Sequence, residues 1–199
     1  MKIFIFILIL YIAFFMGIRI IKQSRSHKVL PIVTIIVFRI TAILGLIQIA
    51  FPQILDVLGR DPEKLISGEW WRIVTPLFVQ DGGLSGLISN LFLLGILGVV
   101  VERLFNRKKW IVLYFGTGIL AECIAYLWYL RGAGNSIANA GLASGLIMLA
   151  VFQTNTRTRI VGFACIGLAL LLSLLGDLHG IALILGTFLA SIILFLKKL

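Results

Sequence analysis

Seven apolar stretches, each close to the length of one membrane crossing, make up most of this 199-residue chain. A transmembrane helix needs about 20 consecutive, mostly apolar residues, within a range of about 17 to 25. Because 60% of the residues are apolar and only 13% are charged, the chain is predicted to be an all-α, polytopic transmembrane helix bundle and not a soluble domain. The stretches cover residues 3–21, 30–51, 83–101, 110–130, 136–152, 160–175 and 178–196.

The positions of the basic residues predict the orientation of the chain in the membrane. The net charge of +10 does not indicate nucleic-acid binding, because the basic residues cluster in short gaps between apolar stretches, where charge determines topology. If the gap at 19–29 is cytoplasmic, twelve of the 18 basic residues lie on that side and five lie outside. We therefore expect a protein of the bacterial plasma membrane, embedded in the lipid bilayer, with its N-terminus outside and its C-terminus cytoplasmic. The twelve are Arg19, Lys22, Arg25, Lys28, Arg103, Arg107, Lys108, Lys109, Arg157, Arg159, Lys197 and Lys198.

One long connection, residues 52–82, contrasts with the otherwise short gaps. It is expected to lie outside, and it holds Trp70, Trp71 and Pro76 among short apolar runs. Tryptophan side chains are enriched at the boundary between lipid and water, so this loop is predicted to lie in the membrane interface.

Polar side chains within the apolar stretches are the candidates for function, because the bilayer interior penalises polar groups. Hydrogen bonding between helices and close helix packing are the alternative roles for the serines and asparagines. Glu122 is expected to be protonated or to pair with a neighbour such as Asn139, and Arg39 to reach the interface or to pair with Glu122. The candidates are Arg39, Asn90, Glu122, Ser136, Asn139, Ser144 and His179.

His179 lies near the outer end of the last stretch and shares a helix face with Ala182 and Gly186. Small residues one turn below the imidazole leave room for another helix, which would bring a hydroxyl within hydrogen-bond reach. A serine becomes a nucleophile when an imidazole can take its proton. The alternative is a histidine capped by water at a helix end, with Asp177 nearby.

Two serines of the fifth stretch are the candidate partners of this histidine. Ser136 follows Gly-Ala-Gly-Asn at the outer end, where the first N–H groups of the helix would be free to stabilise an oxyanion. Ser144 lies about 12 Å deeper, at 1.5 Å per residue, between small residues that are typical of helix packing. Depth therefore favours Ser136 as the partner of His179.

Three segments resemble the rhomboid family of intramembrane serine proteases. GEWWRIVTPLF at 68–78 is similar to the family's Trp-Arg loop, and SNLFLLGILGVVVERLF at 89–105 is similar to its second core helix. HGIALILG at 179–186 is similar to its histidine helix.

The resemblance implies a six-helix core within residues 30–199. Residues 1–29 would then supply one extra N-terminal transmembrane helix and a basic cytoplasmic linker. In the second core helix, Asn90 would be the family's asparagine and Glu102 the acid that closes the helix.

In the family the nucleophile lies in a Gly-x-Ser-Gly motif, which neither serine matches fully. Ile137 replaces the final glycine after Ser136, and Leu142 replaces the first glycine before Ser144. The 43 residues from Ser136 to His179 fit the family pattern, whereas the 35 residues from Ser144 to His179 are too few. Ser136 is therefore the predicted nucleophile and Ser144 the alternative.

The function that the resemblance implies is an intramembrane serine endopeptidase. It would cleave transmembrane protein substrates near the outer membrane face through a dyad of Ser136 and His179, with Asn90 and the Ser136 N–H holding the oxyanion. The resemblance implies no cofactor and no metal. A transporter or channel would need two halves with matching broken helices, which the sequence does not show.

Two departures from the family support an alternative function. Gly86 stands where many members have a histidine that helps to bind the oxyanion, and Ala140 stands where an aromatic ring commonly packs on the catalytic imidazole. Losing one oxyanion donor costs about 100- to 1,000-fold in rate. The alternative is a catalytically inactive rhomboid-like protein that binds transmembrane helices.

Overall fold

The computed structural model describes residues 1–23 and 30–196, and the regular secondary structure within these ranges is helical. Within these ranges, six helices are long and apolar enough to cross a membrane, and the 16-residue α8 is a shorter apolar helix. The predicted all-α transmembrane bundle is thereby confirmed. The long helices are α1 (Lys2–Gln23), α2 (Ile32–Ala50), α5 (Gly83–Phe105), the continuous α6 (Arg107–Ile111) to α7 (Thr117–Leu127), α9 (Thr156–Leu174) and α10 (Leu178–Phe195).

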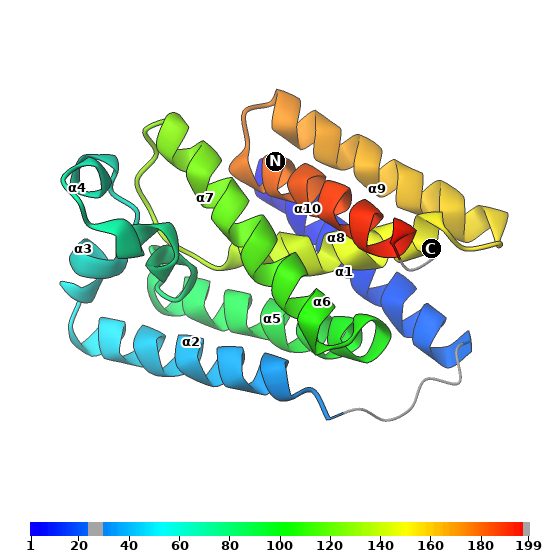
Figure 1. The fold of residues 1–199 in the computed structure, drawn as a ribbon, viewed down its shortest axis with the longest axis horizontal. Coiled ribbons are helices and arrows are strands. Elements are labelled where there is room, and N and C mark those ends of the chain that lie inside the picture. The colour runs from blue at the N-terminus through cyan, green and yellow to red at the C-terminus, as the bar shows by residue number, and fades with distance from the viewer. Residues whose placement is uncertain (24–29, 197–199) are drawn as a thin grey trace.

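The shorter α8 (Ser136–Val151) lies at the centre of the bundle, in contact with α1, α5, α7, α9 and α10 (Figure 1). Its small residues permit this central position, because a methyl group added at Gly141 would collide with the carbonyl of Leu113. At Gly186 of α10 an added methyl would lie 2.8 Å from Ser144 Oγ. The close approach that the small residues of the last stretch predict is therefore an approach of α10 to α8.

The extra helix α1 is an integral part of this bundle. It packs against α8, α9 and α5, and its Gly17 is so close to α5 that an added methyl would lie 2.6 Å from Val100 Cγ1. Lys2 Nζ donates a 2.6 Å hydrogen bond to the Leu175 carbonyl, so α1 begins beside the turn between α9 and α10. The buried face of α1 consists of Phe6, Ile9, Leu10, Ala13, Met16, Gly17 and Ile20.

Residues 52–82 fold over one end of the bundle, here called the loop end, and contain α3 (Ile54–Leu58) and α4 (Pro62–Ile66) (Figure 1). Arg72 is 1% exposed and ties this segment together through Glu69 and the carbonyls of Asp56 and Gly59. The neighbouring Trp70 is 70% exposed, as expected of an interfacial tryptophan.

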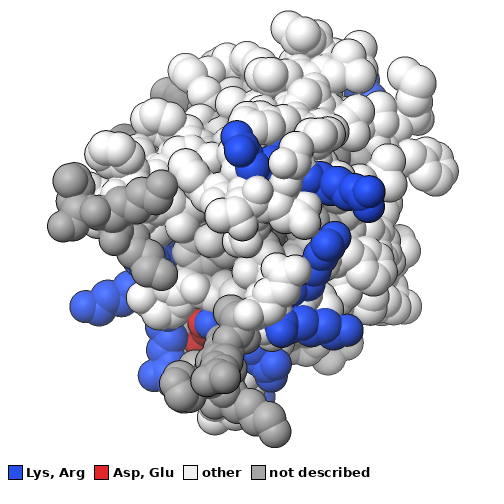
Figure 2. All heavy atoms as spheres, turned by 90° about the vertical axis from the view of Figure 1, so that its right-hand side faces the viewer, with Lys and Arg blue, Asp and Glu red and all other residues white. Residues whose placement is uncertain are grey.

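At the opposite end of the bundle, Glu102 closes α5 and also caps α2. Its carboxylate accepts hydrogen bonds from the backbone N–H groups of Val33 and Thr34 and from the Thr34 hydroxyl, at 2.8–3.0 Å. These N–H groups belong to the first turn of α2 and have no partner within that helix. Figure 2 faces this end and shows Lys and Arg side chains gathered on it, so we call it the basic end. The linker residues Arg25 and Lys28 and the C-terminal Lys197 and Lys198 lie outside the described residues.

Candidate active site

Ser136 and His179 meet at the loop end of the bundle. Ser136 is the first residue of α8 and His179 lies in the first turn of α10, and the Ser136 Oγ to His179 Nε2 distance is 3.1 Å. Both side chains are partly exposed, and they line a small cavity of about 130 Å³. Its other lining residues are Arg60, Asp81, Ala133, Gly134, Ile137 and Leu178. A hydroxyl and an imidazole at this distance form the arrangement that activates a serine.

Asp177 holds the other ring nitrogen of His179. The distance from its Oδ1 to His179 Nδ1 is 2.8 Å, and the same oxygen accepts the backbone N–H of His179 as the N-cap of α10. The hydrogen bond with the His179 ring lowers the pKa of the Asp177 carboxyl below its ordinary value, so the carboxylate is charged at neutral pH. A charged acceptor at Nδ1 favours the tautomer that carries its proton there and leaves Nε2 free to accept from Ser136.

Phe6 packs on the face of the same imidazole. Its ring centroid lies 4.3 Å from that of His179, at an interplanar angle of 38°. Ala140, where the resemblance to the rhomboid family implies an aromatic ring, is buried in α8, and the ring that contacts the imidazole belongs to α1. No local pattern in residues 3–21 indicates this contact, because it joins the first helix of the chain to the last.

Ser144 lies deeper in α8 and is fully buried. Its hydroxyl donates a 2.8 Å hydrogen bond to the carbonyl of Leu183 in α10. Because Gly186 of α10 lies directly against Ser144 and Gly141 of α8, this hydroxyl links two closely packed helices. The structure therefore pairs His179 with Ser136 and gives Ser144 a partner in the backbone.

Asn90 lies on α5, facing the segment that precedes Ser136. A methyl group added at Gly134 would lie 3.6 Å from Asn90 Nδ2, 3.8 Å from Ser136 Oγ and 3.3 Å from Gln80 Oε1. The glycine, with a φ of +146°, leaves this point open between the serine and two carboxamides. The N–H of Ser136 belongs to the first turn of α8, where backbone donors have no helical partner. The space beside Ser136 is thus bordered by two N–H groups suited to an oxyanion, those of the Asn90 side chain and the Ser136 backbone, whereas the Gln80 oxygen beside it accepts from Asn90.

Glu122 forms a buried ion pair with Arg60, which corrects the expectation of a bond to Asn139 or Arg39. Arg60 Nη1 lies 2.9 Å from Glu122 Oε2, and the two side chains are 8% and 1% exposed. Asn139 instead donates to the Asn90 carbonyl, and Arg39 lies exposed on α2. The sequence could not supply this pairing, because Arg60 comes from a loop 62 residues away.

This ion pair supports the loop that precedes the candidate nucleophile. Arg60 also pairs through its backbone with Gly132 and donates from Nε to the Leu130 carbonyl, so it fixes the segment before Ser136. We expect Glu122→Gln to lower the free energy of unfolding by about 3 kcal/mol, because it leaves the Arg60 charge buried without a counter-charge. Thermal unfolding in detergent measures this loss.

A double variant separates charge from packing at this pair. Arg60→Met combined with Glu122→Leu removes both charges and is expected to be more stable than Glu122→Gln alone. A Glu122→Gln protein as stable as the wild type would contradict a supporting role for the ion pair.

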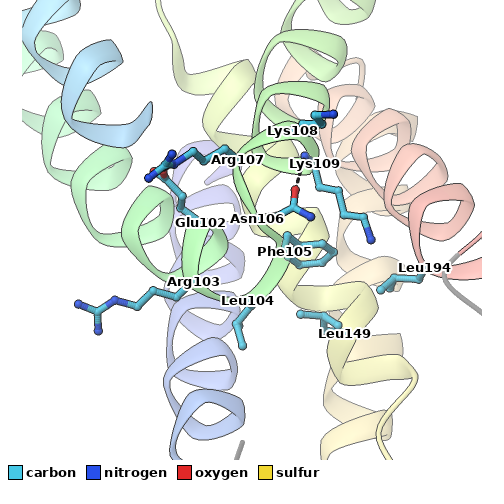
Figure 3. A pocket seen from close by; sticks show the side chains of 10 residues that line it. All are labelled: Glu102, Arg103, Leu104, Phe105, Asn106, Arg107, Lys108, Lys109, Leu149 and Leu194. Carbon is cyan, nitrogen blue, oxygen red and sulfur yellow. Dashed lines mark hydrogen bonds and ion pairs between the residues drawn. The ribbon is translucent and has the colours of Figure 1, made fainter. Parts of the chain in front are cut away.

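A larger cavity, of about 740 Å³, lies at the basic end, away from Ser136 and His179. Figure 3 shows Lys109 extending across it toward Leu149 and Leu194, whereas Arg107 turns toward Glu102. The Arg107 Nε to Glu102 Oε1 distance is 3.7 Å. The larger of these two cavities therefore lies at the opposite end of the bundle from Ser136 and His179. In residues 1–23 and 30–196, no group of three or more His, Cys, Asp and Glu side chains is placed to hold a metal ion.

Comparison with known proteins places this geometry in context. A family model described as the rhomboid domain matches residues 67–194, more than half of the chain. The chain is similar to the rhomboid protease GluP of Bacillus subtilis (strain 168), with 28% identity over 112 residues that cover 55% of this chain and 22% of the relative. It is also similar to the putative rhomboid protease YdcA of the same organism, with 26% identity over 144 residues that cover 68% of each chain.

A third relative is the rhomboid-like protease 2 of Toxoplasma gondii, with 35% identity over 75 residues that cover 37% of this chain and 26% of the relative. The chain thus spans only about a quarter of the length of this relative and of the first one. No solved structure matches the chain.

Proposed function

The chain belongs to the rhomboid family, and on this premise we propose that it is an intramembrane serine endopeptidase that cleaves transmembrane substrates through Ser136 and His179. The observation that carries the proposal is the 3.1 Å distance between Ser136 Oγ and His179 Nε2. The two residues lie 43 positions apart in the sequence, and the packing of α8 against α10 brings them together.

The proposed reaction follows from the positions of these groups. His179 Nε2 takes the hydroxyl proton as Ser136 Oγ attacks the carbonyl carbon of the scissile peptide bond. The negative charge that develops on the carbonyl oxygen is stabilised by the Asn90 side-chain amide and by the Ser136 N–H. The protonated imidazole then donates its proton to the leaving amine, and water releases the acyl group from Ser136 by the same steps in reverse order.

The proposed substrate class is based on the location of Ser136 and His179 at one end of a bundle of membrane-spanning helices. The substrate is a transmembrane helix that unwinds near one membrane face, where small or helix-breaking residues weaken its backbone hydrogen bonds. The charge distribution of the sequence supports the proposal that the loop end lies at the outer face and the basic end at the cytoplasmic face.

A fluorophosphonate probe tests the proposal, because it phosphonylates only an activated serine. We expect the wild type to be labelled, Ser136→Ala to be unlabelled, and Ser144→Ala to be labelled like the wild type, because the Ser144 hydroxyl is bonded to the Leu183 carbonyl. Labelling is measured by gel fluorescence, with thermal unfolding as the control for folding. Labelling that disappears only in Ser144→Ala would move the nucleophile to the alternative serine.

An inactive, helix-binding protein is the second candidate function. Gly86 in place of the oxyanion histidine and the small volume of the cavity at Ser136, about 130 Å³, favour it. A folded wild-type protein that no serine probe labels, but that binds transmembrane helices, would support this function over the protease.

A further inference from the structure

Gly86, near the start of α5, leaves an open space where another residue would place its side chain. Among the described residues, and apart from the neighbouring backbone of its own helix, an added methyl at Gly86 would meet one atom within 4 Å, the Cβ of Gln80 at 3.9 Å. Gln80 belongs to the loop that leads into α5, and it is 2% exposed. A buried glutamine therefore lies next to the position where the glycine leaves room for a side chain.

Gln80 is rigidly held. Its backbone N–H donates to Gln48 Oε1 at 2.8 Å, and its carbonyl accepts from Gln48 Nε2 at 2.6 Å. Its side-chain Nε2 donates to Asn135 Oδ1 at 3.3 Å, and Asn135 donates in turn to the hydroxyl of Tyr114. A side chain with both ends fixed in this way can hold the orientation of a third group.

That third group is the carboxamide of Asn90. Asn90 Nδ2 donates to Gln80 Oε1 at 2.6 Å, which uses one of its two N–H donors. Because a carboxamide is planar, this bond fixes the direction of the second N–H as well. The open point beside Ser136 lies 3.6 Å from the same nitrogen and 3.3 Å from the Gln80 oxygen that holds it, so an oxyanion would have to lie on the Asn90 side of this point.

Building on the proposed function, we infer that Gln80 is a positioning residue that aims the Asn90 amide at the oxyanion, in compensation for the side chain missing at Gly86. Without the Gln80 oxygen, the Asn90 amide is free to rotate, and its N–H no longer points at the developing charge. A donor that is displaced by about 1 Å loses about 100-fold in rate.

The experiment compares Gln80→Ala with the double variant Gln80→Ala/Gly86→His. We expect Gln80→Ala to react with the fluorophosphonate about 10- to 100-fold more slowly than the wild type and to lower kcat on a transmembrane reporter while leaving KM unchanged. The histidine of the double variant fills the vacated space and supplies a new partner or donor, so labelling is expected to recover at least about tenfold.

The outcomes separate this inference from the proposed function. If Ser136 of the wild type is labelled and folded Gln80→Ala reacts at the wild-type rate, Gln80 has no positioning role. A slower reaction that the histidine does not restore, together with a lower Tm, would assign Gln80 to stability alone and overturn the inference. A wild type without labelling at Ser136 would instead overturn the proposed function.

Discussion

His179→Ala is expected to lower kcat on a transmembrane reporter by at least about 1,000-fold, while the protein stays folded. The imidazole is the one group within hydrogen-bond distance of Ser136 Oγ among those that the structure describes and that can take its proton. Without it, Ser136 remains a weakly nucleophilic alcohol. The reporter is a protein with a single transmembrane helix whose outer end contains small and helix-breaking residues, and cleavage is followed in proteoliposomes.

The chain offers a matched control for this variant. The other histidine of the chain, His27, lies outside the described residues. The His27→Ala variant is expected to cleave the reporter like the wild type. Undiminished cleavage by His179→Ala would contradict the dyad, whichever serine is the nucleophile.

Asp177→Asn is expected to lower kcat by about 100-fold without lowering the Tm. Asparagine is as good an N-cap as aspartate, so the first turn of α10 keeps its capping hydrogen bond. The carboxamide, however, can also donate to Nδ1 and thereby stabilise the tautomer whose Nε2 carries the proton and cannot accept from Ser136. In serine proteases with a full triad the corresponding change costs about 10,000-fold. A smaller loss is expected here, because the Asp177 and His179 side chains are 14% and 28% exposed.

Measuring both kcat and Tm distinguishes the role of Asp177 as the N-cap of α10 from its role as the acceptor for His179 Nδ1. A role limited to capping predicts that Asp177→Asn is as active as the wild type and that Asp177→Ala loses both stability and activity. Equal kcat values for the wild type and Asp177→Asn would therefore remove Asp177 from the mechanism.

The membrane helices could be predicted from the sequence because each is determined by its own residues. The first predicted stretch, residues 3–21, lies within α1 (Lys2–Gln23), and the last predicted stretch, 178–196, differs from α10 by one residue. Hydropathy is a local property, and a helix satisfies its own backbone hydrogen bonds. Helix ends with polar residues are less well predicted: α9 begins at Thr156 instead of 160, and α5 ends at Phe105 instead of 101.

The sequence also placed Ser136 and His179 at the same end of the bundle, because the chain crosses the membrane in alternating directions. It did not identify the groups that surround them. Phe6, Gln80 and Arg60 reach the site from the first helix and from the long loop, and their positions depend on how distant segments pack. Polar residues in a loop carry no periodic signal that would distinguish a buried glutamine from an exposed one.

Asp177 was the exception that a local signal could have revealed. An aspartate two residues before a histidine at the start of a helix is a typical N-cap, and its carboxylate lies close to the ring of that histidine. In the sequence analysis Asp177 appears only as a residue near His179, in the alternative in which water caps the histidine at the helix end. The structure shows that one carboxylate oxygen serves both the helix end and the imidazole.

The structure of the protein after reaction with a fluorophosphonate tests the central proposal most directly. We expect a covalent bond between Ser136 Oγ and phosphorus, with the phosphoryl oxygen about 2.7 to 3.1 Å from Asn90 Nδ2 and from the Ser136 N–H. An adduct on Ser144, or a phosphoryl oxygen that turns away from Asn90 into solvent, would contradict it.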